Sequence, residues 1–238
     1  MSVSGGISLI IGLGNPGAEY ATSRHNLGYL TIDALLPLLG AGVSSAAAPV
    51  PSAAVPSGSS PSSRQASPPQ KESGSFLSSL FSRQKVPYTK LRCEAIVSEL
   101  DYRGRRIVLA KPQTYMNRSG RSLKGLLKHY GLTIDETLVV HDDLDVPQGV
   151  LRVKVGGGHG GHNGLRSLID DCGADFARVK IGTGRPPGQM PADRYVLQQL
   201  HGKAFEELKT DANRAAEVVL TILRDGILAA QNTFNCQN

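Results

Sequence analysis

Two glycine-rich segments, far apart in the chain, each place a histidine beside an asparagine: GLGNPGAEYATSRHNLG at 12–28 and GGGHGGHNG at 156–164. Glycine serves where backbone bends sharply or approaches a ligand closely, and fixing it on folding is entropically costly. Histidine exchanges protons near neutral pH, and an asparagine amide holds a carbonyl or a water without carrying charge. The two segments therefore indicate a site rather than packing.

The first segment places His25 among polar side chains in the turn region that follows an apolar strand-like run. A neutral imidazole there could take a proton from water if a carboxylate or carbonyl fixes its tautomer; the alternative is a histidine that simply packs at a helix start. GLGNPG also matches the dinucleotide fingerprint GxGxxG. Pro16 stands where a phosphate-binding turn should donate N–H groups, which argues against a nucleotide cofactor.

HDDLD at 141–145 directly follows the apolar run TLVV and offers the required carboxylate. Side chains alternate along a strand, so Asp142 and Asp143 should point to opposite faces and only one should meet the histidine. Two other interpretations stay open. The three acids could hold Mg²⁺, although that ion usually takes only one or two carboxylates, or they could form an ordinary turn.

The second segment is too rich in glycine to be helical before Asn163. His159 and His162, three residues apart, are therefore a weak metal pair. We predict that Asn163 is the N-cap of a helix beginning near Leu165. The helix N-terminus and the amides before it would then receive anionic or carbonyl oxygens.

KPQTYMNRSG at 111–120 runs from a strand into a helix and places Tyr115, Met116 and Asn117 on the connecting loop. An aromatic ring beside an amide can stack on a base and hold a carbonyl. Basic residues follow at Arg152, Lys154, Arg178, Lys180, Arg185 and Arg194. If strands 151–155 and 177–182 are neighbours, alternate members form a positive stripe suited to phosphates; a charged, solvated sheet edge is the other interpretation.

The elements that must position these residues alternate between strands and helices. Short β-branched runs predict strands at 7–13, 93–100, 106–110, 137–141, 151–155 and 177–182. Apolar periodicity predicts helices at 25–39, 119–130, 164–172 and 203–225. We expect an α/β fold: a single domain with a mixed, mostly parallel central sheet and helices on both faces, including a hairpin turning at 101–104.

Residues 40–75 are almost entirely Ala, Ser, Pro and Gly, a composition that buries too little apolar surface to offset its ordering entropy. We interpret them as a disordered insertion in one domain spanning 1–238. The cluster Phe76, Leu77, Leu80 and Phe81 that follows is interpreted as core packing, with a docking patch as the alternative.

Composition narrows the class of protein. No apolar run approaches the roughly 20 residues that cross a bilayer, so no membrane association is expected. Three scattered cysteines without CxxC spacing argue against a disulfide framework or zinc cage. A net charge of +6 is compatible with a polyanionic partner.

Taken together, these motifs resemble the bacterial-type peptidyl-tRNA hydrolases. The resemblance rests on GLGNPGAEYATSRHNLG, KPQTYMNRSG, HDDLDVPQGVLRVKVGGGHGGHNGLRSL and FARVKIGTGRP, in that family's order, and covers nearly all of the chain except residues 40–87 and the tail. It implies a single mixed sheet flanked by helices. It also implies hydrolysis of the ester that joins a peptide to the 3′ end of tRNA, without metal or organic cofactor. The expected partner is the acceptor stem and 3′ end of peptidyl-tRNA, with no stable protein partner and a monomeric state.

The resemblance also implies roles for individual residues. His25 matches the base that activates water, and Asp142 the carboxylate that orients it. Asn15 and Asn117 match residues that hold the substrate near the scissile ester, with Tyr20 beside them. His162 and Asn163 match residues that receive the 3′-terminal nucleotide. Lys154 matches a phosphate-clamping base. The departures are Tyr115, where many members have Phe, and Lys180, where many have Arg; the second loses bidentate phosphate geometry.

Two other functions remain open from sequence alone. A non-catalytic RNA-binding relative acting in organellar RNA processing would keep the same fold and pocket. A metal-dependent amidohydrolase using HDDLD and HGGH would lose its activity to a chelator. The charge and the low-complexity insertion suit either a cytoplasmic or a mitochondrial protein.

Overall fold

The computed structural model describes residues 6–41 and 90–236. The predicted insertion, beyond its first two residues, and the Phe76–Phe81 cluster lie outside these ranges. The strands are β1 (Leu9–Gly12), β2 (Lys90–Arg92), β3 (Ala95–Tyr102), β4 (Arg105–Pro112), β5 (Thr137–Asp143), β6 (Leu151–Val155) and β7 (Ala177–Gly182). The helices are α1 (Leu27–Ala41), α2 (Ser119–Tyr130), α3 (Asn163–Cys172), α4 (Ala192–Leu197), α5 (Lys203–Asp225) and α6 (Ile227–Phe234), with single 3₁₀ turns η1 (Arg24–Asn26), η3 (Met116–Arg118) and η4 (Ile134–Glu136).

The seven strands form one sheet in the order β2-β3-β4-β1-β5-β7-β6. The four central strands β4, β1, β5 and β7 run parallel, and β2, β3 and β6 at the two sides run antiparallel to their neighbours. The mixed, mostly parallel sheet predicted from the sequence is therefore confirmed. So are the β3–β4 hairpin and the pairing of 151–155 with 177–182.

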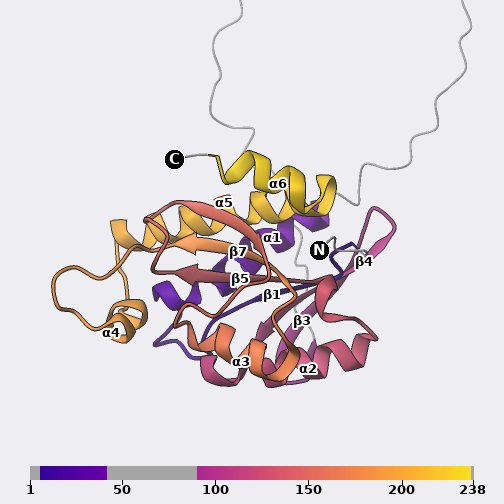
Figure 1. Ribbon diagram of the computed structural model, residues 1–238, viewed down its shortest axis with the longest axis horizontal. Helices are drawn as coiled ribbons and strands as arrows, with labels where there is room; N and C mark the ends of the chain where they lie inside the picture. The colour runs from indigo at the N-terminus through magenta and orange to yellow at the C-terminus, as the bar shows by residue number, and fades with distance from the viewer. Residues whose placement is uncertain (1–5, 42–89, 237–238) are drawn as a thin grey trace, which may run out of the picture.

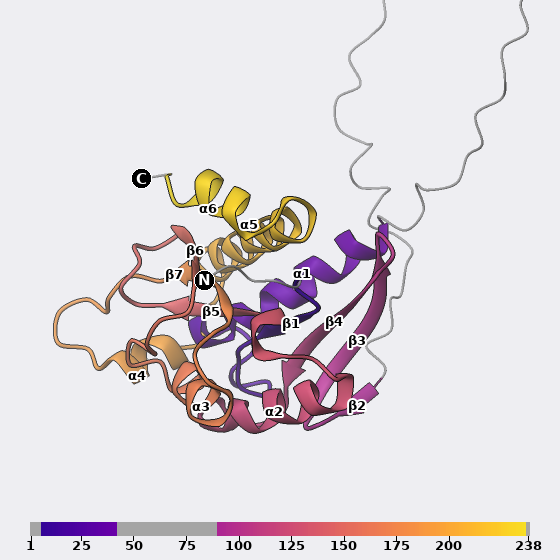
Figure 2. The ribbon, with the colours of Figure 1, turned by 45° about the vertical axis from the view of Figure 1, so that its right-hand side comes forward.

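Helices cover both faces of the sheet, as predicted (Figure 1; Figure 2). The core on one face packs α1 and α5 against alternate residues such as Leu138 and Val140 of β5. On the other face α2 and α3 pack against Val139 and its neighbours. Successive β5 residues thus belong to different layers, which is the alternation expected of a buried central strand.

Short elements were not predicted from the sequence. Strand β2 has only three residues, α4 lies between the predicted strand 177–182 and the predicted helix 203–225, and α6 follows that last predicted helix. Helix α6 covers the β6 edge of the sheet: the Asn235 side chain that follows it pairs with both the N–H and the carbonyl of Val153, at 2.8 and 2.9 Å. No helix in the described part of the chain is long and apolar enough to cross a membrane.

A close contact between two glycines joins the end of β1 to the start of α1. A Cβ on Gly12 would collide with the Gly28 carbonyl, and a Cβ on Gly28 would collide with the backbone of Leu13 and Val140. Because β1 and α1 meet backbone to backbone, the η1 turn between them is held over the carboxyl end of β5. This places His25 beside Asp142 of the HDDLD segment.

We expect Gly28→Ala to lower the free energy of unfolding by about 1–3 kcal/mol, the usual cost of overpacking a rigid core. The added methyl group meets backbone atoms, which cannot rotate away. Denaturant unfolding followed by circular dichroism measures the change. Gly158→Ala is the matched control, since a Cβ there has open space and the residue is not in the left-handed region; equal losses in both variants would contradict this account.

Candidate active site

A cavity of about 750 Å³ opens where β1 and β5 end, at the carboxyl ends of the parallel strands. Open α/β sheets bind ligands at this edge. Eight of the predicted site residues line the cavity: Asn15, His25, Tyr115, Met116, Asn117, Asp142, His162 and Asn163. Tyr20, Lys154 and Lys180 are not among the lining residues. The structure thus brings together four segments that are separate in the sequence.

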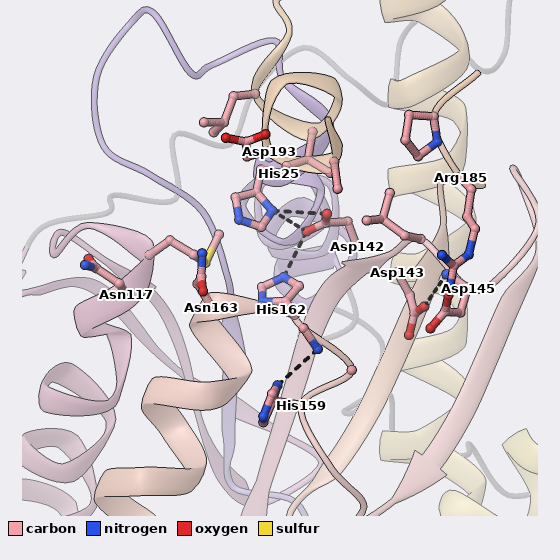
Figure 3. Close-up of a pocket in the computed structure, with 18 of the residues that line it drawn as sticks. His25, Asn117, Asp142, Asp143, Asp145, His159, His162, Asn163, Arg185 and Asp193 are labelled. Carbon is pink, nitrogen blue, oxygen red and sulfur yellow. Dashed lines mark hydrogen bonds and ion pairs between the residues drawn. The ribbon is translucent and has the colours of Figure 1, made fainter. Parts of the chain in front are cut away.

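His25 and Asp142 form a buried hydrogen-bonded pair. The His25 Nδ1 lies 2.9 Å from Oδ1 and 3.1 Å from Oδ2 of Asp142. An ionised carboxylate only accepts hydrogen bonds, so Nδ1 carries the proton and Nε2 is left with its lone pair. Nε2 lies on the side of the ring away from Asp142, toward Asn163 and Asn117 (Figure 3). This is the tautomer that a general base requires.

His162 contacts the same carboxylate from the other side. Its Nδ1 accepts the backbone N–H groups of Gly164 and Leu165, at 3.1 and 3.3 Å, so the proton lies on Nε2. That Nε2–H donates to Asp142 Oδ1 at 3.0 Å. His162 is therefore the N-cap of α3, and the prediction that Asn163 caps this helix was wrong. Asn163 is the first helical residue and is exposed to the cavity.

His25 and Asp142 shift each other's pKa values, and His162 adds to the shift of Asp142. Burial of the His25 ring lowers its pKa, but the charge of Asp142 and the hydrogen bond to it outweigh burial and raise the pKa above the ordinary value of 6.5. Burial acts against ionisation of Asp142, but His25 and His162 together hold its pKa well below the usual range. Asp142 is consequently ionised throughout the neutral range.

Asn15 is fixed by two partners. Its side-chain Oδ1 accepts the backbone N–H of Met116 at 2.8 Å. Its backbone is clamped by the Asn26 side chain, which accepts from the Asn15 N–H at 2.9 Å and donates to its carbonyl at 3.0 Å. With Oδ1 engaged as an acceptor, the Nδ2 group of Asn15 is left as a donor at the cavity wall. Asn26, next to His25, is thus a structural clamp for Asn15.

The other side of the cavity mouth carries groups that are free to meet a ligand. Tyr115 is 60% exposed, and Asn117 in the η3 turn is also exposed. Asn163, at the start of α3, lies on the same side of His25 as Asn117 (Figure 3). An exposed aromatic ring beside two amides is suited to stacking on a base while the amides hold its polar edge.

The predicted positive stripe is mostly engaged in the structure. Arg178 is fully buried, donates to the carbonyls of Gly157 and Gly158, and so holds the glycine loop. Arg152 donates to the Phe234 carbonyl at 3.4 Å, and Lys180 pairs with Asp143 at 2.6 Å. Lys154 is exposed, and among the described residues no ion pair to it is seen. Of the four, Lys154 is therefore the best placed to meet a phosphate.

The three acids of HDDLD have separate partners rather than a shared one. Asp142 bonds to the histidines, Asp143 to Lys180, and Asp145 to Arg185 at 2.5 Å. The first two confirm that neighbouring acids point to different sides of the strand. The arrangement does not favour a shared Mg²⁺ site. His25, Asp142 and His162 do place ligand atoms within 4.8 Å of one another, but both nitrogens facing Asp142 donate protons to it.

Sequence reasoning missed several residues around the site. Arg24 lies 3.9 Å from the Tyr195 ring centroid and donates to the Tyr195 carbonyl at 3.2 Å, which anchors η1 to α4. The cavity is also lined by Leu144, Pro186, Met190, Val196, Leu197 and Asp193. In the sequence, the apolar residues from Pro186 to the end of α4 were the signal that could have indicated this part of the cavity. They show no periodicity that connects them to a site.

A mixed sheet of this topology, with a buried histidine–carboxylate pair in a cavity at its carboxyl edge, defines an α/β protein whose cavity holds the groups of an acid–base site. Comparison with known proteins gives the family. The profile of the peptidyl-tRNA hydrolase family matches residues 9–54 and 74–238, so the chain belongs to that family. The resemblance noted in the sequence, and with it the expectation of an enzyme that cleaves an ester bond, is confirmed.

Relatives and solved structures agree with the family. Peptidyl-tRNA hydrolase from Pseudarthrobacter chlorophenolicus is 35% identical over 95% of this chain and 94% of its own length. The protein of the same name from Mycobacterium tuberculosis is 36% identical over 94% of this chain and 95% of its own. The crystal structure of peptidyl-tRNA hydrolase from Acinetobacter baumannii superposes with a TM-score of 0.71 at 29% identity, covering 97% of this chain and 95% of that one.

Proposed function

We propose that this enzyme hydrolyses the ester between a peptide, or an N-blocked amino acid, and the 3′ end of tRNA, and so recycles tRNA from aborted translation. The observation that carries the proposal is the His25–Asp142 pair, whose free Nε2 lies at a cavity lined by amides. Family membership supports the substrate. The two together favour turnover over RNA binding alone.

In this mechanism His25 Nε2 takes a proton from the water as its oxygen bonds to the ester carbonyl carbon, and Asp142 stabilises the imidazolium that forms. When the tetrahedral intermediate collapses, the C–O bond to the ribose breaks and the imidazolium returns the proton to the departing 3′ oxygen, releasing the peptide acid and free tRNA. The Nδ2 groups of Asn15 and Asn117, both at the cavity wall, serve as neutral donors for the oxyanion that develops at the ester carbonyl. Asn163 and Tyr115 hold the terminal nucleotide. His162 acts on Asp142, and its Nε2–H keeps the carboxylate ionised and in place. An ester is reactive enough for a positioned water, a base and such donors to suffice.

We propose further that the reaction needs no metal. Each His nitrogen facing Asp142 already shares a proton with it, so a metal bound there would have to displace two protons and two hydrogen bonds. The test is hydrolysis of N-acetyl-aminoacyl-tRNA by the purified enzyme with and without EDTA, alongside an EDTA-treated metalloenzyme as a positive control for chelation. Equal rates are expected. Loss of turnover in EDTA, restored by added metal, would move the assignment to a metal-dependent hydrolase.

Lys154→Ala is expected to weaken tRNA binding and to reduce the slope of log K against log salt by about 0.7–0.9, the share of one phosphate contact. The single-turnover rate at saturating enzyme should be retained, because Lys154 does not line the cavity. Filter binding across a salt series measures the slope. Lys203→Ala, an exposed lysine paired with Glu207 on α5, is the control; an unchanged slope in Lys154→Ala would argue against the contact.

The proposal extends to the setting of the enzyme. We propose that the enzyme acts as a monomer and that its partner is peptidyl-tRNA, as the family suggests. Its basic charge suits either the cytoplasm or the mitochondrion. Of the residues resembling tRNA contacts, Lys180 is the one whose role we expect to be indirect. Its ion pair with Asp143 joins β7 to the segment that follows the catalytic carboxylate.

A further inference from the structure

His141, next to the catalytic carboxylate, is a buried titratable residue that the mechanism above does not use. It is 1% exposed and does not line the cavity. Its Nδ1 lies 2.7 Å from the backbone carbonyl oxygen of Asp142. A carbonyl only accepts, so Nδ1 carries the proton. Nε2 then holds a lone pair and has no hydrogen-bond partner among the described residues.

The Asp142 carbonyl, which accepts the hydrogen bond from His141, lies where β1 and β5 separate at the cavity. Strand β1 pairs with β5 only as far as Gly12 opposite Val140, and the last bond on that edge is from the Leu13 N–H to the Val140 carbonyl, at 2.9 Å. Carbonyls alternate between the two edges of a strand, so that of Asp142 points to the same side as that of Val140. At the level of Asp142, β1 no longer pairs with β5. Without His141 this buried carbonyl would lose its donor.

His141 also packs against the second histidine of the site. Its ring lies edge to face with that of His162, with centroids 5.2 Å apart and an interplanar angle of 78°. His162 in turn packs on His25 with centroids 4.7 Å apart. The Nδ1–H of His141 therefore fixes the peptide unit that follows Asp142. The His141 ring also supports His162, which bonds to the Asp142 side chain.

We propose that His141 is a positioning residue for ester hydrolysis: it fixes the backbone and the histidine partner of Asp142, so that the carboxylate stays aligned on His25. This inference rests on the proposed function. Burial and the neighbouring His162 lower the pKa of His141 to about 3, so the ring remains neutral and keeps the single N–H that the carbonyl needs. An aliphatic residue would fill the same space without an orphaned nitrogen, but it could not donate.

The test compares His141→Leu, which fills the space without a donor, with His141→Asn, whose amide nitrogen can take the place of Nδ1. We expect His141→Leu to lower kcat about 10- to 100-fold with little change in KM, as a misplaced catalytic group does. His141→Asn should recover most of the loss. A purely structural role would lower the Tm of both variants and leave kcat per folded molecule intact. Parental kcat in His141→Leu, or no rescue by Asn, overturns the proposal.

A second measurement uses the parent enzyme and does not depend on a variant folding. Long-range ¹⁵N–¹H NMR spectra distinguish histidine tautomers, and we expect His141 protonated at Nδ1 and His162 at Nε2. A His141 ring protonated at Nε2 would overturn the proposal. Parental turnover of N-acetyl-aminoacyl-tRNA is measured first: its absence contradicts the proposed function, whereas an active parent with unaffected His141 variants contradicts this inference alone.

Discussion

Replacing His25 with alanine is expected to lower kcat for N-acetyl-aminoacyl-tRNA by about 10²–10⁴-fold, the range that a positioned general base contributes. The loss should fall on kcat, because in the proposed mechanism Tyr115 and Asn163 hold the nucleotide and more distant contacts hold the tRNA body. The dissociation constant for deacylated tRNA should change little. Rapid-quench single-turnover kinetics and filter binding measure the two quantities separately.

Two controls sharpen this result. His129→Ala removes an exposed histidine on α2, packed on Tyr130 and away from the cavity, and should leave both constants unchanged. Added imidazole should partly restore turnover in His25→Ala, because the truncated side chain leaves space beside the cavity for a replacement base. Equal losses in rate and affinity would contradict the role of His25 as base and indicate a residue that only holds the substrate.

Strand alternation predicted from the sequence that only one of Asp142 and Asp143 meets His25. HDDLD follows a buried strand, so one acid had to face away from the other, and the histidine-bearing turn follows a neighbouring parallel strand. Parallel strands bring their carboxyl ends to one edge, where the two segments meet. Local periodicity and one topological rule brought one acid of HDDLD to the histidine, and the resemblance to the family implied that this acid is Asp142.

The N-cap of α3 was mispredicted because local sequence patterns do not show the long-range contact that favours His162 over Asn163. Asparagine is among the strongest N-cap residues, so Asn163 was the natural choice. His162 takes that position because its ring can cap through Nδ1 while Nε2 reaches Asp142. That advantage depends on a residue 20 positions earlier in the chain. The same holds for Arg178, which looked like a surface cation but is held under the glycine loop.

The basic stripe shows the limit of charge patterns. The prediction that β6 and β7 are neighbours was correct, and Arg152, Lys154, Arg178 and Lys180 do pair across them. The pattern could not show that an acid from β5 would neutralise Lys180, or that the last residue of α6 would accept a hydrogen bond from Arg152. Long-range partners of this kind decide which cations remain available for phosphates.

Asp142→Asn is the second variant for which we expect a large effect. It removes the negative charge of Asp142 but keeps an oxygen that can accept hydrogen bonds. The amide oxygen can still accept from His25 and His162, since both nitrogens bond to Oδ1 in the parent. The negative charge is lost, however, and with it the stabilisation of the imidazolium that forms as His25 takes the proton. We expect kcat to fall by about 10²–10⁴-fold, as for the orienting carboxylate of a catalytic triad.

The pH dependence of kcat shows in which direction Asp142 shifts the pKa of His25. His25 must be neutral to act, and its pKa is raised in the parent, so kcat should rise with pH and reach half its plateau above pH 6.5. In Asp142→Asn the attraction to the carboxylate is removed while burial still lowers the His25 pKa, so the midpoint should move to lower pH. Single-turnover rates between pH 5 and 9 measure both midpoints, with a tRNA-binding curve at each pH as the control. A midpoint that stays in place, or moves to higher pH, would show that Asp142 does not control the protonation of His25, and the base would have to be sought among the other groups of the cavity.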